Sequence, residues 1–279
     1  MDKNKLIFRI SSIFLHYMGS YFSGPVEHRE YHTNGNLHIL RTFSGKKCEK
    51  KEWYENGQLY IHAYYSENDI LDGERLLWHD NGQLWVREFY KNGQLDGSSN
   101  RWYRDGNLSK QSFYRNGDLD GERKIWYDNG QLETVVTYQN GILEGMKCQW
   151  HPDGQIYTRE FYHDGFCDGE YKSWHENGRL AERKFYQNGR LNGICREWYD
   201  NGQIADCEFY RDNILTGEHR CWYKSGIILG HFFRTRRDID FSVGSKFILL
   251  LMKNRLKTSL ILSRKFMLSS FLISDLIDE

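Results

Sequence analysis

This chain of 279 residues contains little proline and has no excess of charge of either sign. It contains two prolines, and 38 Lys and Arg balance 38 Asp and Glu, which leaves a formal net charge of zero. Proteins that bind the phosphate backbone of nucleic acids carry a basic excess, so we expect no nucleic-acid partner. Long apolar runs are also missing towards the C-terminus, where the longest, FILLLM, falls far short of the ~20 residues that span a bilayer.

The motifs of common catalytic classes are absent as well. Neither GxGxxG nor GxxxxGK[ST] precedes a helix-like segment, the short SGKK at residues 44–47 cannot form a phosphate loop, and no GxSxG occurs. We therefore predict that the protein is not an enzyme and has no catalytic or cofactor-binding residues.

The cysteines follow no paired spacing. No CxxC occurs, and a disulfide framework would place cysteines in a regular lattice within a small secreted chain. We interpret the six as reduced thiols that pack as small apolar groups, which predicts a cytoplasmic, intracellular protein. They are Cys48, Cys148, Cys167, Cys195, Cys207 and Cys221.

What the sequence does contain is a repeat of 24 residues. Each Trp of the series is followed four residues later by Gly, six later by Leu or Ile, and in most copies twelve later by Tyr. The first step is 25 residues, because YYSENDILDGE contains one extra residue. The Trp residues are Trp53, Trp78, Trp102, Trp126, Trp150, Trp174, Trp198 and Trp222.

Each repeat contains two turns. In IWYDNGQLETVVTYQNGILEG, residues 125–145, two Asn-Gly pairs stand between runs of aromatic and β-branched residues. This pattern predicts a hairpin with a type I′ turn, in which both central residues have φ > 0, at each pair. YHTNGNL, residues 31–37, is a degenerate first copy, so we assign residues 28–237 to an array of about eight full repeats plus that copy.

These columns resemble the MORN repeat family, in its variant form WYxNGQLxxxxxFYxNGxLxGE. WYDNGQLETVVTYQNGILEG and WHENGRLAERKFYQNGRLNG match this form well. The resemblance implies an all-β repeat fold: an elongated, twisted, single-layer antiparallel sheet of tandem β-hairpins. It also implies roles in scaffolding and partner binding, with lipid binding or antitoxin-like inhibition in some members. The ending FLISDL is similar to tails of such repeat proteins from giant viruses.

The alternation of residues along GERKIWY supports a single-layer sheet independently of the family resemblance. Lys124 and Glu122 fall with Trp126 on one face, Ile125 and Arg123 on the other, so neither face is purely apolar. Each hairpin alone would be marginal, and stacking against its neighbours stabilises it.

Equivalent positions of neighbouring repeats lie ~9.6 Å apart, twice the strand spacing. The row of His79, His151 and His175 is therefore too widely spaced to bind one zinc ion, whose ligands lie within ~2.3 Å of the metal. The same distance argues against a glycosidase-like pair of carboxylates. We predict no metal site and no acid–base pair. The carboxylates considered were Asp96, Asp120, Glu122 and Glu170.

Both ends differ from the array. Residues 1–27 contain an apolar segment, residues 6–22, which we expect to be a helical cap docked on the array, with a secretory signal or a membrane-surface helix as alternatives. Residues 238–279 have the pattern of a basic amphipathic helix, which either caps the last sheet edge or contacts a membrane surface or a partner. Its cations are Lys246, Lys253, Arg255, Lys257, Arg264 and Lys265.

These observations favour a non-catalytic scaffold that binds a protein partner. The alternatives are peripheral membrane association through the C-terminal segment and antitoxin-like inhibition of another protein. The position before each Trp varies most between repeats, so we predict that this face supplies specificity, with Leu77, Arg101 and Ile125 as a mixed apolar and basic patch.

Overall fold

The computed structural model describes residues 24–234 and shows an all-β, antiparallel protein. Among these residues, the only helical element is η1 (Glu67–Asp69), a short 3-10 turn. The chain divides into two compact units, unit 1 (Met1–Cys167) and unit 2 (Asp168–Glu279).

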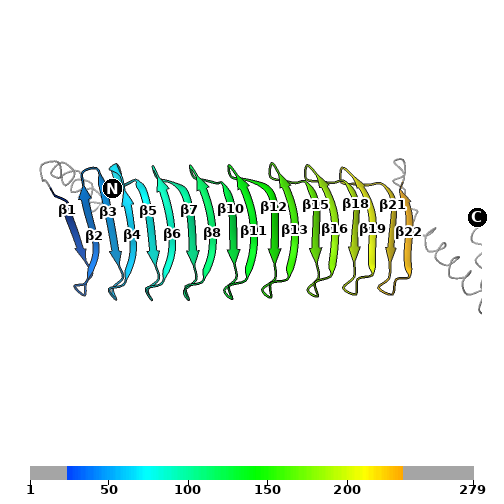
Figure 1. Ribbon diagram of the computed structural model, residues 1–279, viewed down its shortest axis with the longest axis horizontal. Helices are drawn as coiled ribbons and strands as arrows, with labels where there is room; N and C mark the ends of the chain where they lie inside the picture. The colour runs from blue at the N-terminus through cyan, green and yellow to red at the C-terminus, as the bar shows by residue number, and fades with distance from the viewer. Residues whose placement is uncertain (1–23, 235–279) are drawn as a thin grey trace, which may run out of the picture. The chain divides into compact units, whose positions relative to one another are not determined.

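In unit 1, long strands that follow one another along the chain pair side by side, as Figure 1 shows from β1 to β13, and β8 pairs with both the short β9 and the following β10. The strands are β1 (Val26–Tyr31), β2 (Leu37–Ser44), β3 (Lys47–Trp53), β4 (Leu59–Tyr65), β5 (Leu71–Trp78), β6 (Leu84–Lys91), β7 (Gln94–Trp102), β8 (Leu108–Arg115), β9 (Asp118–Leu119), β10 (Gly121–Trp126), β11 (Leu132–Gln139), β12 (Ile142–Trp150), β13 (Ile156–His163) and β14 (Phe166–Cys167).

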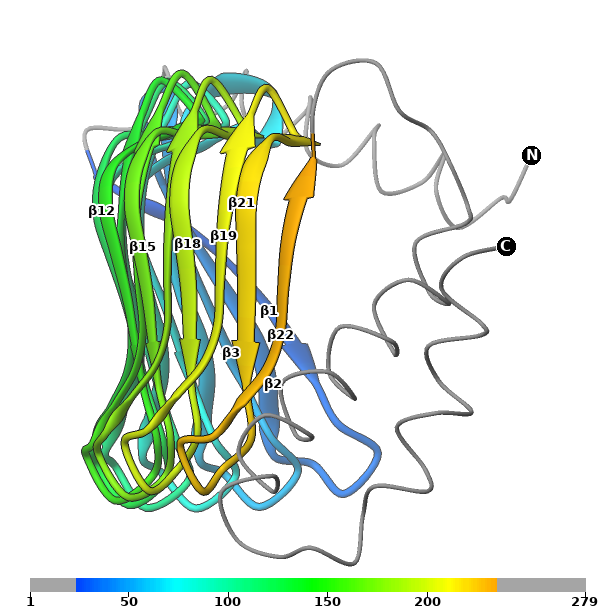
Figure 2. The same ribbon diagram turned by 90° about the vertical axis from the view of Figure 1, so that its right-hand side faces the viewer.

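Unit 2 repeats the same hairpin, and Figure 2 shows β15, β18, β19, β21 and β22 following one another in one layer. Two-residue strands precede the main strand of a hairpin where a bulge interrupts the ladder. The strands are β15 (Gly169–Trp174), β16 (Leu180–Gln187), β17 (Arg190–Leu191), β18 (Gly193–Trp198), β19 (Ile204–Arg211), β20 (Ile214–Leu215), β21 (Gly217–Trp222) and β22 (Ile228–Arg234).

The turn after each Trp differs from the predicted type I′ turn. In Tyr127–Gln131, only Gly130 has a positive φ, 83°. The Gly130 amide donates to Tyr127 O over 3.0 Å, and the Tyr127 amide donates to Gln131 O over 2.9 Å. This is a three-residue loop, a type I turn followed by a left-handed glycine. The prediction of type I′ is wrong here because Asn129 keeps a negative φ and uses its side chain instead: Oδ1 accepts the Gln131 amide over 2.9 Å.

The second turn of the repeat has the predicted geometry. Asn140 and Gly141 have φ of 49° and 78°, and Gln139 pairs with Ile142 across them. Both central residues are left-handed, so the type I′ prediction is confirmed at this position. The extra residue in YYSENDILDGE falls in the corresponding turn, where it forms η1.

The degenerate first copy is also a hairpin. His32 and Asn36 close the turn between β1 and β2 with a 2.8 Å backbone hydrogen bond, and Gly35 has the same left-handed φ, 85°, as the later loops.

Within each unit the two faces of the sheet differ in burial. Residues paired across antiparallel strands share a face, so Arg123, Val136, Ile125 and Thr134 lie on one face, and Glu122 and Lys124 on the other. We call the first the packed face, because nearly all buried side chains occupy its columns. The second is the open face. Buried members of the packed face in unit 1 include Ile39, Ala63, Leu77, Val86, Glu88, Ser99, Ser112, Thr134, Val136 and Thr158.

The expected N-terminal helical cap, residues 6–22, lies outside the described residues. The repeat array begins at Val26, the first residue of β1, two residues before its predicted start at residue 28. The C-terminal segment, residues 238–279, lies wholly outside the described range. Among the described residues, no helix has the length and apolar character needed to cross a membrane.

Candidate interaction surfaces

The residues predicted to contact a partner lie together on the packed face of unit 1, but they differ in exposure. Leu77 is 5% exposed and pairs with Ile61 and Val86 on its two sides. Ile125 is half-buried, and the Arg101 side chain is 52% exposed. Burial leaves Leu77 almost no surface to offer, so Arg101 is the main accessible group of this patch.

Arg101 also has a structural neighbour. Its guanidinium lies 3.8 Å from Oε1 of Glu88, a carboxylate whose residue is only 4% exposed. Glu88 also accepts hydrogen bonds from Arg75 over 3.3 Å, from the Tyr90 hydroxyl over 2.9 Å and from Ser99 over 3.5 Å. Burial, followed by the bond to Glu88, raises the pKa of Tyr90. A buried carboxylate with several donors stabilises the sheet, so this part of the packed face serves folding.

The open face carries a different feature, which we call the aromatic column. In most copies an aromatic ring stands just before the Tyr of the repeat, on the face opposite Glu88. Tyr64 is 38% exposed and Phe113 is 39% exposed, and Met146, which pairs with Phe161, is 45% exposed. The members are Tyr64, Phe89, Phe113 and Phe161 in unit 1 and Phe185 and Phe209 in unit 2.

Arginine side chains border several of these rings. The guanidinium of Arg87 lies 5.2 Å from the centroid of Phe89, and that of Arg159 lies 5.9 Å from Phe161. These are cation–π distances. Arg87 also donates to Glu74 Oε1 over 2.6 Å, which fixes its side chain beside the ring.

Glycine makes room for the aromatic column. Gly97 and Gly121 have φ of 121° and 119°, and a Cβ at either position would lie 3.2 Å from Phe89 Cβ or 3.3 Å from Phe113 Cβ. These glycines therefore combine a backbone conformation that L-residues avoid with close contact to the ring.

The sequence contains a signal for the aromatic column. The dipeptide FY or its equivalent recurs at the end of the second strand of each repeat. Successive residues of a strand point to opposite faces. The Phe therefore had to lie opposite the Tyr, on the face away from the packed core.

A second ladder runs along the turns. The Tyr127 hydroxyl donates to Trp150 O over 2.8 Å, and Asn129 Nδ2 donates to Pro152 O over 2.7 Å, so each loop is bonded to the loop of the following repeat. His175 makes the tyrosine-type bond to Trp198 O, also over 2.8 Å. His79 instead stacks on Trp85, with ring centroids 5.4 Å apart, and His151 packs against Tyr157 in a tilted arrangement, with centroids 4.9 Å apart. The three histidines examined for zinc binding are thus part of the turn packing.

The carboxylates examined as an acid–base pair face cations or backbone amides. Glu122 Oε2 lies 2.7 Å from Lys124 Nζ, and Asp120 lies 2.9 Å from Arg115 Nε. Asp96 accepts a long hydrogen bond, 3.4 Å, from the Asn116 amide, and Glu170 binds both Lys172 and Arg183.

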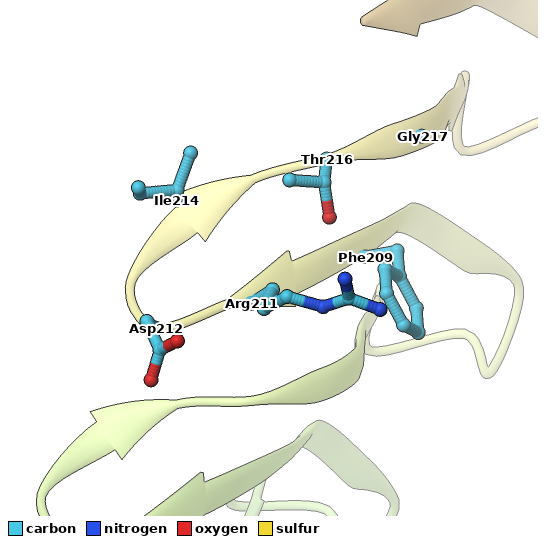
Figure 3. Close-up of a pocket in the computed structure, with 6 residues that line it drawn as sticks. All are labelled: Phe209, Arg211, Asp212, Ile214, Thr216 and Gly217. Carbon is cyan, nitrogen blue, oxygen red and sulfur yellow. The ribbon is translucent and has the colours of Figure 1, made fainter. Parts of the chain in front are cut away.

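A shallow hollow of about 360 Å³ opens in unit 2 beside the turn that connects β19 to β20 (Figure 3). The guanidinium end of Arg211 lies toward the Phe209 ring, while Ile214 and Asp212 point away from it. The charged groups and the ring can contact a partner's side chain. The lining groups do not include a nucleophile paired with a base, which a catalytic site would need. The hollow is lined by Phe209, Arg211, Asp212, Ile214, Thr216 and Gly217.

The six C-terminal cations predicted to contact a membrane or a partner lie outside the described residues, so their role stays a prediction. They are Lys246, Lys253, Arg255, Lys257, Arg264 and Lys265.

Comparison with known families agrees with the repeat geometry. The sequence profile of the family described as MORN repeat variant matches residues 49–67, 71–92, 119–140, 168–188 and 191–212. The comparison with curated proteins gave no match. Because the five matches recur along the hairpins of both units, the chain belongs to the MORN repeat variant family.

Proposed function

We propose that this protein is a non-catalytic scaffold that binds a protein partner through the aromatic column of its open face. The observation that carries the proposal is the recurrence of partly exposed rings at one position of successive repeats, with Tyr64 38% and Phe113 39% exposed. Aromatic and arginine side chains dominate the binding energy of protein interfaces. A row of such rings on a sheet offers a partner several equivalent contacts.

Two features support binding rather than chemistry. The carboxylates considered for acid–base work face cations or backbone amides, which suits electrostatic stabilisation of the sheet. The hollow near Phe209 is lined by an aromatic ring and a guanidinium that lie toward each other, with a carboxylate at its border, and these are recognition groups. Antitoxin-like inhibition is one form that such binding can take, since a scaffold that covers a partner's active surface inhibits it.

The test uses threonine, because Thr137 naturally occupies the aromatic column in one repeat. The wild-type chain and a Tyr64→Thr, Phe113→Thr, Phe161→Thr variant would be used as bait for affinity purification from native cells. We expect the partner captured by the wild type to be lost from the triple variant while circular dichroism stays unchanged. Capture that survives the triple variant would contradict the proposal.

Two matched controls locate the surface. Thr137→Phe completes the column and should retain capture, whereas Arg101→Thr tests the packed-face patch predicted from the sequence. If only Arg101→Thr abolishes capture, the partner binds the patch of Leu77, Arg101 and Ile125.

Membrane association is a second candidate, supported by the run of cations between Lys246 and Lys265 in the sequence. Flotation of the full chain with vesicles containing anionic lipid, compared with a chain ending at residue 238, tests it. Flotation that depends on residues 239–279 would favour the membrane role. Equal behaviour of the two chains would contradict it.

We further infer an intracellular location. All six cysteines are free thiols, and Cys48, Cys148 and Cys195 are buried, which fits a reducing compartment.

A further inference from the structure

Strands β19 and β21 bring three different ligand types together on the packed face of unit 2. Asp206 pairs with Cys221 across the two strands, and His219 lies two residues before Cys221 on the same face. One oxygen of Asp206, one nitrogen of His219 and the sulfur of Cys221 all lie within 4.8 Å of one another. All three residues are half-buried, so the cluster lies within the packed face and still has access to solvent.

The hydrogen bonds of His219 already point its ring into this cluster. His219 Nε2 lies 2.9 Å from Asp206 Oδ2 and 3.7 Å from Glu208 Oε1. Glu208 is held in turn by the Tyr210 hydroxyl, which donates to Oε2 over 2.8 Å. Two carboxylates therefore lie near the same imidazole nitrogen, Asp206 in direct contact and Glu208 further away.

The space beside Cys221 is also unusual for this fold. On β22 the residue paired with Cys221 is Gly230, which has no side chain. In the preceding repeat, the residue equivalent to Cys221 is Glu197, and it pairs with Asp206 instead of a glycine. The thiol thus has a carboxylate on one side and, on the other, a buried glycine that presents no side chain.

We propose that Asp206, His219 and Cys221 bind a divalent transition-metal ion, with zinc as the best fit. Thiolate, imidazole and carboxylate together form the donor set of tetrahedral zinc sites. Zinc–ligand distances of about 2.0 to 2.3 Å require the donor atoms to lie roughly 3.3 to 3.8 Å apart, so small side-chain rotations suffice. Binding replaces the proton shared by His219 and Asp206 and releases the thiol proton of Cys221. The bound ion would join β19 to β21 across the strand pair.

The spacing that excludes a zinc site in the row of His79, His151 and His175 does not apply to this cluster. Equivalent columns of different repeats are ~9.6 Å apart. Here the ligands come from different columns on adjacent strands, which lie only ~4.8 Å apart. The alternation in EHRCW, which places His219 and Cys221 on one face, was the available signal.

A second cluster, Glu144, His163 and Asp164, provides a matched control. Its donor atoms also lie within 4.8 Å, but His163 and Asp164 are exposed and no thiol is present. Exposed groups of this kind are ordinary turn contacts, since Glu144 accepts the Asp164 amide over 3.0 Å.

The test is titration of the reduced full-length protein with Co²⁺, followed by displacement with Zn²⁺. A thiolate bound to cobalt gives a charge-transfer absorption in the near ultraviolet, so the spectrum reports whether Cys221 is a ligand. We expect this band in the wild type and in His163→Gln and Cys207→Ser, and its loss on addition of zinc. Cys221→Ser should abolish the band, and His219→Gln should weaken cobalt binding by about 100-fold or more.

The proposal is overturned if the wild type shows no thiolate band at millimolar cobalt, or if the band survives in Cys221→Ser. Circular dichroism of each variant keeps the test independent of folding. A variant that loses its β spectrum would be replaced by Asp206→Asn, which makes the same prediction as His219→Gln.

Discussion

The packed faces of the two units have the same strand geometry but differ in the sign of their excess charge. Among the charged side chains of this face, cations outnumber carboxylates in unit 1, whereas carboxylates outnumber cations in unit 2. The cations of unit 1 are Arg41, Lys50, Arg75, Arg101, Lys110, Arg123 and Lys147, with Glu30, Glu52, Glu88 and Glu160 among them. The carboxylates are Glu182, Glu197, Asp206 and Glu208, with Lys184 among them.

Burial beside like charges shifts the pKa in opposite directions in the two units, because it disfavours the charged form of a lysine in one and of a glutamate in the other. Burial, together with Arg123 and Arg101, lowers the pKa of Lys110. Burial, with Glu182, Asp206 and Glu208, raises the pKa of Glu197 in spite of nearby Lys184. The turn and glycine columns therefore specify the hairpin, while the charge and polarity of side chains inside the strands can differ between the units. The fold therefore sets few limits on what each unit recognises.

The largest expected effect concerns the glycine column of Gly121 and Gly193, which both units share. Gly121→Val in unit 1 and Gly193→Val in unit 2 should each lower the free energy of unfolding by about 3 kcal/mol, because they force a β-branched residue to positive φ and against Phe113 or Phe185. Gly130→Val is the matched control: its φ is 83°, but nothing lies near its Cβ, so we expect a cost of about 1 to 2 kcal/mol. Denaturant unfolding measures all three. Equal costs at Gly121 and Gly130 would show that the ring contact contributes nothing.

The next effect should be confined to unit 1. Glu88→Ala removes the acceptor shared by Arg75, Tyr90 and Ser99, and should lower the free energy of unfolding by about 2 kcal/mol. Glu122→Ala, on the open face, should change it by less than about 0.5 kcal/mol. Thermal unfolding of the two variants decides the matter. A small effect at Glu88 would mean that the packed face is stabilised by apolar contacts alone.

A smaller effect tests the ladder between turns. Asn129→Asp keeps the acceptor for the Gln131 amide but removes the donor to Pro152 O, at a cost of about 1 kcal/mol. Asp105 occupies this column naturally and still accepts the Asn107 amide over 2.9 Å, so the loop itself should survive. Hydrogen exchange at the Gln131 amide should stay slow. Fast exchange there would show that the whole turn depends on the interloop bond.

The smallest effects should have opposite signs in the two units. Hydrogen bonding to Lys51 lowers the pKa of Glu49, so its charge stabilises the fold above the usual pKa of a glutamate, and this stability is lost as the pH falls through the folded-state pKa. The raised pKa of Glu197 favours its protonated form, so the stability it contributes is present at low pH and lost as the pH rises through that pKa.

At pH 7, Glu49→Gln should therefore lower the unfolding midpoint and Glu197→Gln should raise it. Both differences should shrink below about pH 4, where glutamates are protonated. Unfolding midpoints measured across this range provide the test. A lower midpoint for Glu197→Gln at pH 7 would show that its attraction to Lys184 outweighs burial.

Much of the fold could be predicted because the columns that determine it recur. Gly130 and Gly141 mark the two turns, and the period places them on successive hairpins. The geometry of the first turn could not be read from Asn-Gly alone, because a type I turn with a left-handed glycine and a type I′ turn favour the same dipeptide. The hydrogen bond of Asn129 to its own loop decides between them.

The candidate surfaces were harder to predict. The variable position before each Trp was correctly placed on one face, but variability does not report exposure, and neighbours on both sides bury Leu77. The ring of Phe113 is partly exposed because Gly121, which lies beside it, has no side chain to cover it. The cluster around His219 depends on strand register, which the repeat period alone does not specify.

The central claim is that the aromatic column, and not the packed face, recognises the partner. A photo-crosslinking amino acid placed at residue 113 or at residue 101 tests it within one repeat, since Phe113 lies on the open face and Arg101 on the packed face. After illumination in native cells, we predict a covalent adduct with a protein partner from residue 113 and none from residue 101. An adduct from residue 101 alone, or from neither position, would contradict the account.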